Sequence, residues 1–162
     1  MKTKYLKTLL IAFLLTYIAS CSKPMMDAQV VEDVRFASEK VSTDKETSYY
    51  AARWALKNNS YPVAVEDIDN GRMETSWMPT TSDSHGIMLF SRRELGVNGA
   101  YYKLIVNVVH DGDKTRIDVG SKIKSVVSGV KSTGIEERRI LREIKTYLRA
   151  AEPDITNIGL QE

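Results

Sequence analysis

The chain has 162 residues, of which 43% are hydrophobic and 27% charged, and its formal net charge at pH 7 is +2. This composition is typical of a globular domain and excludes low-complexity and disulfide-rich classes, because the chain has a single cysteine. Three lysines fall in a segment that we expect to be removed, which leaves 20 of the 23 basic residues against 21 acidic ones. The mature chain therefore has no basic excess to attract nucleic acid.

Residues 1–20 have the pattern of a secretory signal peptide that is removed. Lys2, Lys4 and Lys7 form a positive start, and a mainly apolar run from Thr8 to Ala19 follows. This run is about a dozen residues long, whereas a transmembrane helix needs roughly 20.

The end of this run is more specific than a general cleavage site. Ile18, Ala19 and Ser20 followed by Cys21 resemble the lipobox of bacterial lipoproteins. In that family the cysteine sulfur receives a diacylglyceryl group, the chain is cut just before the cysteine, and the new amino group is usually acylated. The alternatives are an ordinary signal peptide with an incidental cysteine, or an uncleaved membrane anchor.

The lipobox resemblance implies that Cys21 is the first mature residue and carries the only bound group that we expect, a covalent lipid. Two or three acyl chains, such as palmitate, hold a protein stably at a membrane. Ser22 stands where an aspartate would favour retention in the inner membrane, by resemblance to enterobacterial sorting patterns. We therefore expect a lipid anchor in the outer membrane, with the protein facing the periplasm.

The first part of the mature chain predicts a tether and then a helix. Residues 21–42 are expected to form the lipidated tether, in which Val30–Phe36 is either a strand or a segment that becomes ordered on a partner. The sequence from Thr43 to Glu46 has the pattern of a capping box, with the Thr43 hydroxyl as the cap. Apolar residues then recur at helical spacing, which predicts a helix over residues 44–58.

The middle of the chain predicts a run of strands. An alternating segment at 61–68, the turn signal Asn70-Gly71 and a returning segment at 72–78 predict a hairpin. After a polar loop at 80–86, residues 87–94 predict either a strand or a short helix. Segments rich in β-branched and aromatic residues then predict two strands joined by a turn at 111–113, at 100–109 and 115–124.

The last part predicts a second helix and a tail. Thr133 and Glu136 form a second capping-box pattern before an apolar stripe over residues 135–150, and residues 151–162 form the tail. We therefore expect residues 43–150 to form a single α+β domain, in which an antiparallel sheet of about five strands is flanked by an N-terminal and a C-terminal helix packed on one face.

The sequence shows no catalytic constellation, and we expect no enzymatic activity. A Gly-x-Ser-x-Gly elbow, an HExxH motif and a phosphate-binding glycine loop are all missing. His110-Asp111-Gly112-Asp113 holds metal-type ligands, but this pattern is first of all a tight turn, so we expect no metal. His85 lies in the polar loop near Asp83 and is interpreted as a solvated histidine without a nucleophile to activate.

Three segments of the chain together resemble a known family. Ala52-Arg53-Trp54-Ala55-Leu56, Tyr61-Pro62-Val63 and Met73-Glu74-Thr75-Ser76-Trp77 are similar in order and pattern to the helix-grip domains of BamC, a lipoprotein of the outer-membrane β-barrel assembly machinery. The strand at Tyr102–Val106 also fits, and the resemblance covers residues 43–150. BamC proteins carry two such domains behind a long segment that contacts the partner lipoprotein, whereas this chain has room for one domain and a short tether.

The resemblance implies a helix-grip-like fold and a non-enzymatic adapter with a protein partner in an envelope assembly or secretion complex. Its groove would lie between the second helix and the sheet. The alternative is a periplasmic carrier or binding module for a lipid or other small amphiphile. An interior apolar pocket favours the carrier, and a filled core with an exposed apolar patch favours the adapter. The aromatic residues proposed for the groove are Trp54, Trp77, Tyr102 and Tyr147.

Overall fold

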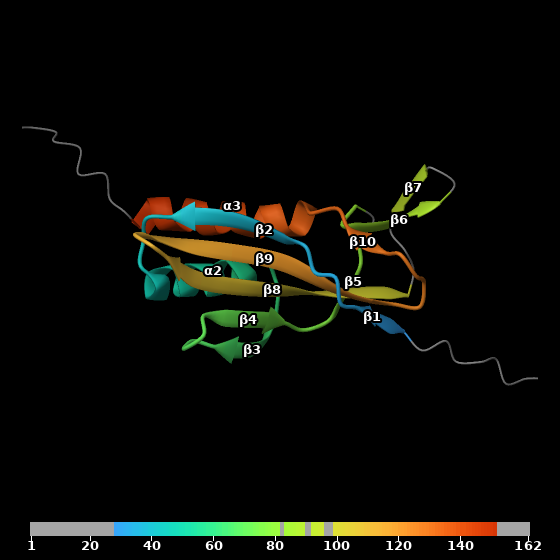
Figure 1. The fold of residues 1–162 in the computed structure, drawn as a ribbon, viewed down its shortest axis with the longest axis horizontal. Helices are drawn as coiled ribbons and strands as arrows, with labels where there is room; N and C mark the ends of the chain where they lie inside the picture. Colours follow the sequence, from blue (N-terminus) through green and yellow to red (C-terminus); the bar gives the residue numbers. More distant parts are fainter. Residues whose placement is uncertain (1–27, 82, 90–91, 96–98, 152–162) are drawn as a thin grey trace, which may run out of the picture.

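The structure is a computed structural model that describes residues 28–81, 83–89, 92–95 and 99–151. The predicted signal peptide, the lipobox with Cys21 and residues 152–162 of the predicted tail lie outside the described residues. The described part is an α+β arrangement in which two helices pack on one face of an antiparallel sheet (Figure 1). The predicted fold class is confirmed.

In the described part of the chain, the larger sheet has seven strands and is built around one long hairpin. Strands β8 and β9 pair along their whole length, from Ala100 with Ser125 to Asp111 with Lys114. The strand order is β1-β9-β8-β4-β3, with β2 also paired to β9 and β5 to β8. The strands are β1 (Gln29–Val31), β2 (Phe36–Val41), β3 (Val63–Asp67), β4 (Arg72–Thr75), β5 (Met78–Pro79), β8 (Ala100–Asp111) and β9 (Lys114–Ser125).

The two helices of the described residues, α2 (Lys45–Asn58) and α3 (Ile135–Ala151), cover one face of this sheet. Helix α2 buries small side chains such as Ala51 and Ala55, which allow close approach, and α3 buries Ile140 and Ile144. They meet the alternate residues of β8 and β9 that face the core: Leu104, Val106, Val108, Ile117 and Val119. In the part of the chain that the structure describes, neither helix is long and apolar enough to cross a membrane.

A second, smaller sheet lies beyond the N-terminal end of α3 (Figure 1). The described residues give it three strands in the order β10-β6-β7: β6 (His85–Leu89), β7 (Arg92–Leu95) and β10 (Lys131–Ser132). The segment 87–94, predicted as one strand or a short helix, is therefore divided between two paired strands. Met88 pairs with Arg93, and residues 90–91 between the strands lie outside the described residues.

The predicted tether over residues 21–42 is corrected by the structure, because residues 29–41 contribute two strands to the sheet. Both β1 and β2 pair with the outer edge of β9, and Phe36 lies opposite Gly120. A Cβ atom on Gly120 would lie 2.7 Å from Val34 and 2.8 Å from the Phe36 ring. Because Gly120 has no side chain, Val34 and Phe36 can pack closely against β9 at this point.

Neither predicted capping box forms. The N-cap of α2 is Asp44, whose carboxylate accepts a hydrogen bond from the Thr47 N–H at 2.9 Å, while the Thr43 hydroxyl contacts the Ser48 hydroxyl. Before α3, the Thr133 hydroxyl donates to the carbonyl oxygen of Asp83 instead of capping the helix. Both helix starts were nevertheless predicted correctly. The cap of α2 is one residue after the predicted one, and a carboxylate caps a helix as well as a hydroxyl does. The predicted cap of α3 does not form.

Candidate binding site

The four aromatic residues proposed for one groove lie at three different places. Trp54 of α2 and Tyr147 of α3 stack with ring centroids 4.6 Å apart, and each side chain is partly exposed. Trp77 lies between β4 and β5 beside the Lys103 ammonium, on the face of the sheet away from the helices. Tyr102 is 2% exposed and lies in the core. The structure therefore brings together only Trp54 and Tyr147.

A buried polar cluster surrounds Tyr102 at the start of α3. The Tyr61 hydroxyl donates to a Glu136 carboxylate oxygen at 2.5 Å and lies 3.0 Å from the Tyr102 hydroxyl. Arg139 donates to the Tyr61 hydroxyl and pairs with Glu136. Burial, followed by the hydrogen bond to Glu136, raises the pKa of Tyr61 far above its usual range. These groups satisfy one another, so the cluster joins α3 to the end of α2 and to the sheet.

His85 lies beside this cluster and is completely buried, so the interpretation of a solvated loop histidine is wrong. Its ring centroid lies 4.5 Å from that of Tyr102, and its Nδ1 lies 2.8 Å from the Ser84 hydroxyl. Burial lowers the pKa of His85 to about 4, although the Glu137 carboxylate opposes this shift. The imidazole is therefore neutral at pH 7.

Two buried atoms near this histidine have no hydrogen-bond partner among the described residues, namely His85 Nε2 and Glu137 Oε2. Glu137 is held through its other oxygen, which accepts from the Ser132 hydroxyl at 2.6 Å. The described residues contain no group of three or more histidine, cysteine, aspartate or glutamate residues placed to hold a metal ion. His110 and Asp113 lie at the β8–β9 turn, as the sequence indicated.

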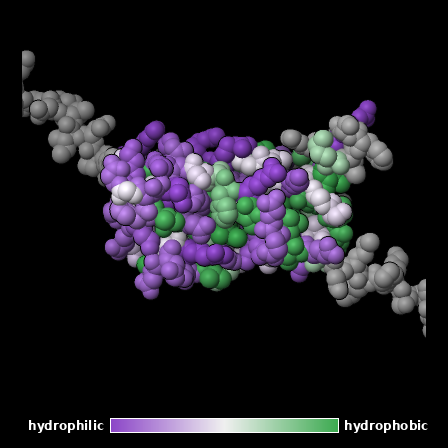
Figure 2. All heavy atoms as spheres, viewed as in Figure 1, coloured by the Kyte–Doolittle hydropathy of each residue, from purple (hydrophilic) through white to green (hydrophobic). Residues whose placement is uncertain are grey.

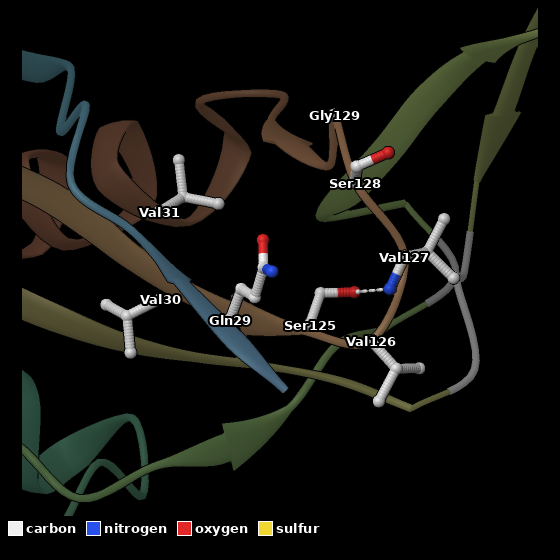
Figure 3. A pocket seen from close by; sticks show the side chains of 8 residues that line it. All are labelled: Gln29, Val30, Val31, Ser125, Val126, Val127, Ser128 and Gly129. Carbon is white, nitrogen blue, oxygen red and sulfur yellow. Dashed lines mark hydrogen bonds between the residues drawn. The ribbon is translucent and has the colours of Figure 1, made fainter. Parts of the chain in front are cut away.

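A hollow of about 600 Å³ lies at the end of the larger sheet, between β1 and the segment that follows β9 (Figure 3). We call it the β1 hollow. One side is β1 and the other is residues 125–129, and the hollow is open to solvent. Its lining mixes apolar and polar side chains: Val30, Val31, Val126 and Val127 with Gln29, Ser125 and Ser128. The Ser125 hydroxyl accepts a hydrogen bond from the Val127 N–H at 3.0 Å, which fixes the turn of this segment.

A second hollow, of about 450 Å³, lies where the sequence predicted a groove between the C-terminal helix and the sheet. It separates the edge strand β2 from α3, and its lining is largely charged. Glu39 accepts from Lys145 across it at 2.7 Å, with Arg138 and Arg142 on the same flank of α3. None of the four predicted aromatic residues lines it.

The chain matches no protein-family model, and no curated protein matches it in sequence. Its likenesses to solved structures are distant. TTHA0849 from Thermus thermophilus is 12% identical with a TM-score of 0.40, over 74% of this chain and 99% of that chain. Norcoclaurine synthase from Thalictrum flavum, in complex with dopamine and hydroxybenzaldehyde, is 11% identical with a TM-score of 0.43, over 80% and 94%.

A DUF4468 family protein from Bacteroides ovatus ATCC 8483 is 9% identical with a TM-score of 0.33, over 79% of this chain and 90% of that chain. Likenesses at these scores carry no conclusion about function. The candidate site therefore depends on the geometry of the chain itself.

Proposed function

We propose that the protein is a lipid-anchored binding module of the bacterial cell envelope, without catalytic activity, that takes up a lipid or another small amphiphile in the β1 hollow. The observation that supports this proposal is the lining of the hollow. Four valines offer apolar contact, while Gln29 and Ser128 offer hydrogen bonds to a polar group. A volume of about 600 Å³ is within the usual range of small-molecule sites, roughly 300–1,000 Å³.

The position of the hollow also suits an anchored protein. Strand β1 is the first described element, and residues 21–27 between it and the lipid on Cys21 span at most roughly 25 Å when extended. The β1 end of the domain is thereby held close to the membrane. An amphiphile that leaves the bilayer would meet this end first. We place the anchor in the outer membrane, with the domain on the periplasmic side.

Photolabelling tests the proposal. The full-length lipidated protein is reconstituted in vesicles that contain a phospholipid with a diazirine in its acyl chain, and labelled peptides are mapped by mass spectrometry. We expect labels on residues 29–31 and 125–129. Val127→Glu places a carboxylate in the apolar lining, so we expect labelling there to fall about ten-fold, because an unpaired carboxylate is costly to bury.

Val109→Glu is the matched control. Val109 is 38% exposed and Val127 is 37% exposed, but Val109 lies near the β8–β9 turn, far along the hairpin from the β1 hollow. Labelling of the hollow should be unchanged in this variant. Absence of label from the hollow in the unmodified protein, or an equal loss in both variants, would show that the hollow does not bind the amphiphile.

A second candidate is the adapter that the BamC resemblance implies, and β2 favours it. Among the described residues this strand pairs only with β9, so its other edge offers backbone hydrogen bonds to an added strand. Arg138, Arg142 and Lys145 lie beside that edge and suit an acidic partner segment. Affinity purification of the full-length protein from native membranes would then recover an envelope assembly or secretion protein, and less of it with Cys21→Ala.

A further inference from the structure

The face of the larger sheet that the helices leave uncovered exposes aromatic and apolar side chains from its β1 end to its middle, where Phe36 lies opposite Gly120. Phe36 is 43% exposed, Trp77 40% and Tyr101 45%, and Val30 lies on the same face. Figure 2 views this face directly, with hydrophilic residues dominating the end at the β8–β9 turn and hydrophobic residues gathering toward β1. We call this end, with those four side chains, the β1-end patch.

Three lysines accompany the aromatic residues. The strand register places Lys124 opposite Tyr101 and Lys103 opposite Lys122, all directed away from the helices. Like charges that lie directly opposite in a sheet repel each other. Glu74 pairs with Lys103, and Glu32 lies 3.1 Å from Lys122, but no described acid pairs with Lys124.

The other end of the same face differs in kind. Arg116 pairs there with Asp118 at 3.2 Å, and Lys40 pairs with Asp111 at 2.9 Å, so positive and negative side chains neutralise each other. At the β1 end of this face, by contrast, the exposed Tyr101 lies opposite Lys124, which has no described acid partner.

We infer that the β1-end patch lies against the surface of an anionic phospholipid membrane. Tryptophan and tyrosine prefer the interface between headgroups and acyl chains, and lysines are attracted to anionic headgroups. The lipid on Cys21 would hold this end within roughly 25 Å of the bilayer. The inference rests on the membrane anchoring in the proposed function, and it adds an orientation in which the helices face away from the bilayer.

The two tryptophans of the chain give a direct test, because they lie on opposite faces of the sheet. Trp54→Phe leaves Trp77 as the only tryptophan, and Trp77→Phe leaves Trp54. Each full-length lipidated variant is reconstituted in vesicles of phosphatidylglycerol and phosphatidylethanolamine whose acyl chains are brominated near the headgroup. We expect the brominated lipid to quench most of the Trp77 emission and little of the Trp54 emission.

A charge variant provides a second measurement. Lys122→Gln with Lys124→Gln should reduce the quenching of Trp77, and the apparent affinity of the patch for the surface should fall about five-fold for each lysine removed. The control is Lys131→Gln, which changes an exposed lysine on β10 in the smaller sheet and should leave the quenching unchanged. Added salt should act like the double variant.

The outcomes separate the orientation from the anchoring. A protein that floats with the vesicles but shows equal quenching of both tryptophans, or stronger quenching of Trp54, overturns the orientation and leaves the proposed function intact. A protein that does not float with the vesicles overturns the anchoring, and the orientation fails with it.

Discussion

Gly71→Ala is expected to lower the free energy of unfolding by about 3 kcal/mol. Gly71 ends the β3–β4 turn with φ +68°, and a Cβ atom there would lie 2.2 Å from the carbonyl oxygen of Val108. The same backbone carries a hydrogen bond, in which the Val108 N–H donates to the Gly71 carbonyl at 2.7 Å. Left-handed backbone costs roughly 1–2 kcal/mol in a non-glycine residue, and forcing the turn away from β8 adds about 1–3 kcal/mol.

Gly112→Ala separates these two contributions. Gly112 has nearly the same backbone, with φ +70°, but its Cβ would meet no atom within 4 Å. We expect this variant to lose only the conformational part, about 1 kcal/mol. Urea denaturation of both variants measures the difference. If the two variants lose the same free energy, the close contact between Gly71 and β8 does not determine stability.

Acidification is expected to destabilise the fold through His85. Burial lowers the pKa of His85 from its ordinary 6.5 to about 4 in the folded protein. Between these values the unfolded chain binds a proton that the folded protein does not, so stability is complete above pH 6.5 and falls as the pH approaches 4. A pKa shift of this size corresponds to a loss of about 3 kcal/mol in the free energy of unfolding. Solvent does not screen this effect, because His85 is fully buried.

Denaturation curves recorded from pH 7 to pH 4 check this expectation. His85→Gln removes the titrating group and should flatten the dependence of stability on pH. His110→Gln changes the other histidine, which is exposed at the end of β8, and keeps His85, so the fall in stability due to His85 should remain. A His85→Gln variant with an unchanged dependence on pH would contradict the assignment.

The parts of the fold that were predicted correctly depend on local pattern. The alternation along 100–109 and 115–124 determines both the β8–β9 hairpin and which residues face the core. The apolar stripe of α3 likewise identifies Ile140 and Ile144 as buried. Strand β2 was not predicted because it depends on pairing with β9, whose residues lie about 80 positions away. The sequence of a short segment does not reveal so distant a partner.

The candidate site was less predictable for the same reason. Tyr102 was correctly placed on a strand, and Trp54 and Tyr147 on helices, but whether these side chains share a groove depends on how the elements pack. Glu136 fitted a capping-box pattern, yet its carboxylate binds the Tyr61 hydroxyl, which lies 75 positions away. The β1 hollow could not be predicted at all, because β1 and residues 125–129 meet only through the sheet.

The lipid anchor, on which both proposals depend, is tested most directly by the intact mass of the protein purified from membranes. The account predicts a mature chain that begins at Cys21 and carries a diacylglyceryl group with or without a further acyl chain, and a Cys21→Ala variant that carries neither. A chain that retains residues before Cys21, or an unmodified Cys21, would contradict it.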